Sequence, residues 1–153
     1  MDQRVAKLRT PEDCLRFEKN ALTLDRPDLA TEARNRALAL QASRYGAKTQ
    51  AEQECLQAVY AYERILTEKN GRTTRASRTW PLIERKGVIA AVESIVTRER
   101  STMGFDALAA NGLDEHAFEA VVLRHPQHFS EAAVSTSKRR LEAWRAGSGC
   151  GGS

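Results

Sequence analysis

The sequence has no long apolar run and no pair of closely spaced cysteines. No segment approaches the roughly 20 apolar residues that a membrane-spanning helix needs, and the first 25 residues lack the apolar core of a signal peptide. The three cysteines, Cys14, Cys55 and Cys150, are odd in number and form no CxxC pair. These absences exclude a disulfide framework and a structural zinc site, and they favour a cytoplasmic protein.

Motifs of the common catalytic sites are also absent. The chain contains no GxSxG nucleophile elbow, no Walker-type phosphate loop and no GxGxxG. No HExxH or paired ExxH arrangement fixes a metal, although four residues of ligand type lie within thirteen positions: His116, Glu119, His125 and His128. We therefore predict no catalytic residue, no metal and no cofactor. The alternative is a catalytic site that only the fold assembles, which needs no local motif.

The composition is that of an ordinary folded domain, but the charge is unevenly distributed. Hydrophobic residues make up 41% and charged residues 29% of the 153 residues, so extended disorder is not expected. Residues 69–100 contain eight basic and three acidic side chains, a net +5, whereas 101–137 contain one and five, a net −4. Such blocks indicate a basic face suited to a polyanion and an acidic face suited to a protein partner or to solubility.

Three helices are predicted within residues 10–70. Thr10 and Thr49 each precede an acidic residue three positions later, which is the pattern of a capping box. Gly46 and Gly71 follow the last periodic residues and are suited to C-terminal stops. Apolar residues recur at helical spacing between these signals, and two cysteines fall on the predicted buried faces, where we expect them to be core residues: Cys14 and Cys55.

Shorter helices are predicted after residue 71. Gly87 separates a short helix, Trp80–Lys86, from one that runs to about Arg98 and is apolar over most of its circumference, which indicates a central position. Residues 99–104 are expected to form a polar loop, and residues 105–110 at most two helical turns. Further predicted helices begin at Asp114, which caps a helix to about His125, and at Ser130.

The predicted fold class is therefore all-α. An N-terminal three-helix bundle at 1–70 packs with a second group of four to five shorter helices at 71–146. The last residues, 147–153, read GSGCGGS and predict a flexible tail.

The segment Asn70–Gly87, NGRTTRASRTWPLIERKG, is the best candidate for a functional surface. Three of its arginines recur at every third residue among hydroxyl-bearing residues. In a loop, guanidinium groups can pair bidentately with successive phosphates, and hydroxyl groups commonly contact phosphate and sugar. We predict the following nucleic-acid-binding residues: Arg72, Thr73, Thr74, Arg75, Ser77, Arg78, Arg85 and Lys86.

Two other interpretations of this segment stay open. In the first, one or two of the arginines bridge the acidic faces of neighbouring helices and the rest are solvated. In the second, the helices flanking Gly87 form a helix-turn-helix. The second helix is too apolar for exposure in a major groove, because only four of its residues are polar: Glu93, Ser94, Thr97 and Arg98.

These observations lead to two functional hypotheses. The first is a nucleic-acid-binding regulatory or accessory protein, with DNA favoured over RNA. The second is a helical protein-interaction module or subunit without catalytic activity, which would use the acidic segment 101–137 and the aromatic residues Trp80 and Trp144. Salt separates them, because phosphate contacts weaken steeply with ionic strength.

Overall fold

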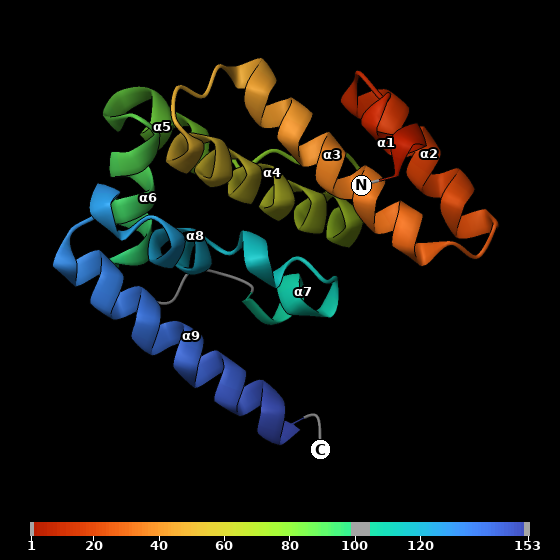
Figure 1. Ribbon diagram of the computed structural model, residues 1–153. Helices are drawn as coiled ribbons and strands as arrows, with labels where there is room; N and C mark the ends of the chain where they lie inside the picture. Colours follow the sequence, from red (N-terminus) through yellow and green to blue (C-terminus); the bar gives the residue numbers. More distant parts are fainter. Residues whose placement is uncertain (1, 99–104, 152–153) are drawn as a thin grey trace. The chain divides into compact units, whose positions relative to one another are not determined.

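The computed structural model describes residues 2–98 and 105–151, and within these ranges it contains α-helices, two short 3₁₀ helices and no strand (Figure 1). The all-α prediction is confirmed. The chain divides into two compact units, Met1–Lys48 and Thr49–Ser153, called here the first and the second unit. No helix in the described part of the chain combines the length and the apolar composition of a membrane span. The predicted polar loop at 99–104 lies outside the described residues.

The first unit consists of α1 (Gln3–Ala6), α2 (Pro11–Thr23) and α3 (Pro27–Tyr45). The cap predicted at Thr10 is present, because the Thr10 hydroxyl accepts a hydrogen bond from the Asp13 amide at 3.1 Å. Helices α2 and α3 pack against each other as a hairpin (Figure 1). Along α3 the buried residues are mostly alanines, which permit close approach of the two backbones: Leu29, Ala30, Ala33, Ala37, Leu38 and Ala42.

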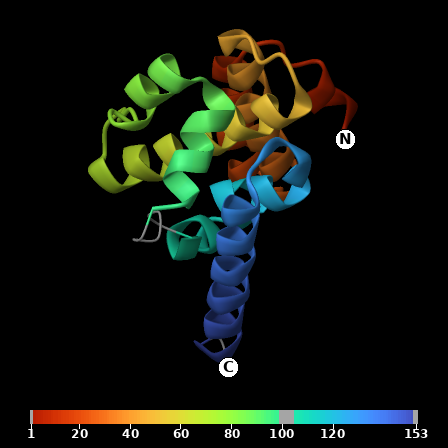
Figure 2. The ribbon, with the colours of Figure 1, turned by 90° about the vertical axis from the view of Figure 1, so that its left-hand side faces the viewer.

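The second unit contains all the remaining helices. They are α4 (Gln50–Asn70), α5 (Thr79–Lys86), α6 (Val88–Val96), α7 (Phe105–Ala110), η1 (Asp114–His116), α8 (Phe118–Arg124), η2 (Pro126–His128) and α9 (Glu131–Gly151). The predicted cap at Thr49 and stop at Gly71 are confirmed: the Thr49 hydroxyl accepts from the Glu52 amide at 3.1 Å, and Gly71 has φ 70°. In Figure 2 the C-terminal half of α9 extends beyond the other helices of this unit.

Helix α6 forms the centre of the second unit. It packs against α4, α5, α8 and α9, and Ala91, Val92 and Val96 are completely buried. The central position predicted for this helix is therefore confirmed. Five of its nine residues are buried in this packing, and the other four residues share a face that contains no cation to contact phosphate: Ile89, Ala90, Glu93 and Ser94.

The boundary between the units lies at a different residue from the one predicted. The sequence pattern places residues 1–70 in one bundle, whereas the second unit of the structure begins at Thr49. The reason is that α4 packs against α6, α7 and α8. A helical pattern shows which face of a helix is apolar, but it does not identify the helix that covers that face.

Two local predictions also differ from the structure. Asp114 begins a 3₁₀ helix and does not cap α8, because Ala117 between them is extended, with ψ 144°. This bend allows both Leu113 and Ala117 to be buried, at 2% and 3% exposure. At the other end, α9 continues to Gly151 through residues assigned to the flexible tail. Extending a formed helix adds a hydrogen bond per residue without a new nucleation cost, which opposes the low helix propensity of glycine.

Candidate functional site

Glu63 is a buried carboxylate of α4 that holds the predicted basic loop. Its Oε2 accepts hydrogen bonds from the Ala76 amide at 2.7 Å, the Trp80 indole Nε1 at 2.6 Å and Arg75 Nε at 3.0 Å. Glu63 is only 8% exposed. A buried charge is costly unless it is paired and hydrogen-bonded, so these three donors tie residues 75–80 to α4.

Arg75 is occupied by this arrangement. Besides its ion pair with Glu63, its guanidinium carbon lies over the Trp80 ring, 5.1 Å from the centroid. The Tyr60 ring also packs against the Trp80 ring, with 5.2 Å between the ring centroids. One of the three arginines therefore bridges to an acid of a neighbouring helix, as the first of the two other interpretations predicted.

Hydrogen bonds within the loop add to its order. The Thr74 amide donates to the Thr67 hydroxyl at 3.0 Å, and the Thr74 hydroxyl donates to the Arg72 carbonyl at 2.9 Å. The Asn70 side chain donates to the Thr74 hydroxyl at 3.1 Å. Thr74, a predicted phosphate ligand, is thus engaged in the structure of the loop, whereas Thr73 and Ser77 are exposed.

The predicted site contains four further cations. Arg72, Arg78, Arg85 and Lys86 are all exposed, and none of them forms an ion pair within the described residues. Glu84 is the one acid in 70–87. We call these four side chains the basic surface.

Helix α5 positions three members of the basic surface. Arg78 immediately precedes the helix, and Arg85 and Lys86 lie in its last turn. Leu82 and Ile83 are buried and fix the orientation of the helix. Arg85 follows Arg78 by seven residues, or about two helical turns, which corresponds to roughly 10 Å along the helix axis.

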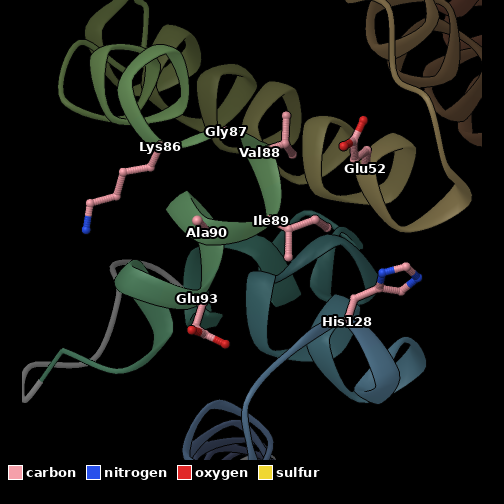
Figure 3. A pocket seen from close by; sticks show the side chains of 8 residues that line it. All are labelled: Glu52, Lys86, Gly87, Val88, Ile89, Ala90, Glu93 and His128. Atoms are coloured by element: carbon pink, nitrogen blue, oxygen red, sulfur yellow. The ribbon is translucent and has the colours of Figure 1, made fainter.

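A pocket of about 400 Å³ lies beside Lys86, where α5 turns into α6 at Gly87 (Figure 3). In Figure 3 the Lys86 and His128 side chains lie on opposite sides of this pocket. Glu52 and Glu93 also line it, and Glu93 Oε1 accepts from the Ser130 amide at 2.7 Å. Two carboxylates in this lining oppose an anion, so the pocket does not extend the basic surface.

Another polar cluster joins α4 to the end of α8. Glu54 Oε1 accepts from Arg124 Nε at 2.6 Å, and Glu54 Oε2 lies 2.7 Å from His125 Nε2. Across the described part of the chain, no group of three or more His, Cys, Asp or Glu side chains could hold a metal ion. Of the other three residues of ligand type, His128 lies near His125, with 6.3 Å between ring centroids, whereas Glu119 pairs with Arg140, 3.4 Å away.

The pH dependence of stability should reveal the Glu54 cluster. Burial raises the pKa of Glu54, but hydrogen bonds from His125, Arg124 and Gln50 outweigh it and leave that pKa below its ordinary value of 4.5. The unfolded state therefore binds more protons at acidic pH. The stabilisation of the folded state by Glu54 is present above pH 4.5 and is lost as the pH falls through the lowered pKa of the folded state.

We expect Glu54→Gln to lower the free energy of unfolding at pH 7, measured by urea unfolding. The difference in this free energy between the variant and the wild type should shrink as the pH falls below 4.5. A difference that grows toward acid would contradict this assignment.

The two helical cysteines are core residues, as predicted. Cys14 and Cys55 are free thiols with 0% exposure. Burial raises the pKa of Cys55 to about 12, and it also raises the pKa of Cys14. Neither side chain is a reactive thiolate at neutral pH.

Glu63 was not among the residues predicted from the sequence pattern. Its contacts lie 12 to 17 residues away in the chain, in a segment selected for its positive charge. One signal was present: Glu63 follows Val59 by four residues on the apolar face of α4, where an uncompensated acid is unfavourable. Trp80 and Trp144, considered as exposed aromatic residues, are both half-buried.

Comparison with known proteins adds no relative: no protein-family model, no curated protein and no solved structure matches the chain.

Proposed function

We propose that this protein binds nucleic acid, with DNA favoured over RNA, and acts as a regulatory or accessory factor. The observation that carries the proposal is the basic surface. Arg72, Arg78, Arg85 and Lys86 are exposed and unpaired on one continuous loop and helix within the part of the chain that the structure describes. Unpaired cations on one segment are the electrostatic footprint that phosphate binding requires.

The anchoring of the loop supports this proposal. Association costs free energy when a flexible loop must become ordered, and preorganisation reduces that cost. Glu63 and Thr67 already hold residues 74–80 through hydrogen bonds of 2.6 to 3.0 Å. In this proposal Arg75 and Thr74 support the loop, while Thr73 and Ser77 remain available as hydroxyl donors to phosphate.

The double variant Arg72→Ala/Arg78→Ala tests the proposal. Each phosphate contact contributes about 0.9 to the slope of log affinity against log salt on B-form DNA. Loss of two contacts should therefore flatten the slope by about 1.8 (2 × 0.9) and weaken binding to every DNA sequence. Fluorescence anisotropy with labelled DNA at several salt concentrations measures both effects.

A matched control removes the same charge elsewhere. Arg9 and Arg16 are exposed in the first unit and form no ion pair with the described residues. Arg9→Ala/Arg16→Ala should leave the slope almost unchanged. Equal slopes for the two double variants would show that general positive charge, and not the basic surface, holds the nucleic acid.

A second candidate function is a helical protein-interaction module. The exposed large hydrophobic side chains of the described residues all lie in the first unit: Leu15, Leu22, Leu24 and Tyr45. Leu15 and Leu22 are seven residues apart and share a face of α2. The acidic segment 101–137 is a weaker candidate, since Glu119 is buried against Arg140. Binding with a shallow salt dependence would favour this function. In either case we propose a cytoplasmic location.

A further inference from the structure

We infer that the partner of the basic surface is a duplex, held by its backbone phosphates, and not a single strand held by stacked bases. This inference rests on the proposed function. It follows from the contacts and the burial of the aromatic side chains next to the four cations.

Proteins that hold single strands combine a basic groove with aromatic faces on which bases stack. Trp80 is the sole aromatic residue in the segment 70–87. Its ring is already engaged by the Arg75 guanidinium at 5.1 Å and by the tilted Tyr60 ring at 5.2 Å. Its indole nitrogen also donates to Glu63 at 2.6 Å.

A base could stack on Trp80 only by displacing one of these groups. Displacing Arg75 would separate its ion pair with Glu63, which is nearly buried. Such separation leaves a carboxylate with less compensation in a low-dielectric site, and this is unfavourable. The existing contacts of Trp80 therefore oppose base stacking.

Tyr62 is another aromatic residue close to the basic surface. Burial raises the pKa of the Tyr62 phenol above its ordinary value, and the nearby positive charge of Arg78 partly offsets this shift. The ring is half-buried in α4 and does not offer a fully exposed platform. Among the described residues, the basic surface thus consists of cations with no fully exposed aromatic face beside them.

A duplex suits such a surface better than a single strand does. B-form DNA carries one negative charge per roughly 1.7 Å of axis, and its phosphates are already held in place. A single strand must be ordered against the fixed loop, which reduces its net affinity. Four phosphate contacts give expected slopes of about 3.6 on duplex (4 × 0.9) and about 2.8 on single strand (4 × 0.7). With equal affinity extrapolated to 1 M salt, the difference of 0.8 corresponds to about tenfold tighter duplex binding at 50 mM salt.

The test uses the full chain with Trp144→Phe, which leaves Trp80 as the single tryptophan. A DNA duplex and one of its strands are titrated separately at 50 mM salt, at equal phosphate concentration. We expect about tenfold tighter binding to the duplex, as derived above from the slopes, with little change in Trp80 emission. Arg75→Ala in this background uncovers the Trp80 ring, so we expect it to raise single-strand affinity relative to duplex affinity.

Two other results are informative in different ways. Single-strand binding as tight as duplex binding, with quenched Trp80 emission, would overturn the duplex inference and leave the proposed function in place. Absence of binding to either DNA would overturn both.

Discussion

Replacing Val92 with aspartate is expected to unfold the second unit. Val92 lies in the middle of α6 and has 0% exposure. Its surroundings on α6 are also apolar, because Val88, Ala91, Ile95 and Val96 are all buried. A carboxylate at this position would be surrounded by these apolar side chains, and burying an unpaired charge costs several kcal/mol. Because the whole stability of a domain is about 5–15 kcal/mol, a large fraction of the molecules should be unfolded.

The measurement is the thermal midpoint followed by circular dichroism. Ala90→Asp is the matched control, since Ala90 is exposed and lies in the first turn of the same helix. The helix N-terminus favours an acid there, whereas Glu52 and Glu93 of the same pocket lining oppose it, so the midpoint of this variant should fall far less than that of Val92→Asp. Equal midpoints for the wild type and Val92→Asp would show that α6 is not the core helix of the second unit.

Removing Arg140 is expected to have the next largest effect. Its Nη1 donates to the Val96 carbonyl at 2.8 Å and lies 3.4 Å from Glu119 Oε2, and its Nη2 donates to the Arg98 carbonyl. Glu119 is 1% exposed, so Arg140→Ala leaves a buried carboxylate without its cation. Breaking a buried ion pair in this way costs about 3–5 kcal/mol.

Urea unfolding measures this loss, and a double-variant cycle assigns it to the pair. Arg139→Ala is the control, because Arg139 is the neighbouring exposed residue of α9 and should cost less than about 0.5 kcal/mol. In Glu119→Gln/Arg140→Ala the charge is absent from both positions, so the double variant should be more stable than Arg140→Ala. If Glu119→Gln does not rescue the loss, the carbonyl contacts of Arg140 and not its ion pair stabilise α9.

Caps and stops made most helix boundaries predictable. Thr10 and Thr49 accept the amides three residues later, and Gly46 and Gly71 adopt the positive φ values of 103° and 70° that glycine tolerates. These features depend on residues within one turn of each other, so a single sequence contains all the information they need.

The basic surface was predictable in composition but not in its division of roles. Arg72, Arg75 and Arg78 are equivalent in the sequence pattern, yet only Arg75 reaches Glu63. The predicted helix from Asp114 is wrong for a related reason, because η1 and its flanking buried residues Leu113 and Ala117 lie where η1 packs against α4, which is distant in the chain. Neither outcome could be derived from local propensity.

The sequence by itself determined the helical class, most helix ends and the burial of the α6 stripe, because these follow from caps, glycine conformations and apolar periodicity. The tertiary structure alone decided which helices α4 packs against and which arginine forms the ion pair with Glu63. It also decided which cations form no ion pair within the described residues. The physical reason is that a buried carboxylate such as Glu63 or Glu119 must find its donors wherever the fold brings them. Those donors, Arg75 and Arg140, lie 12 and 21 residues from their acids.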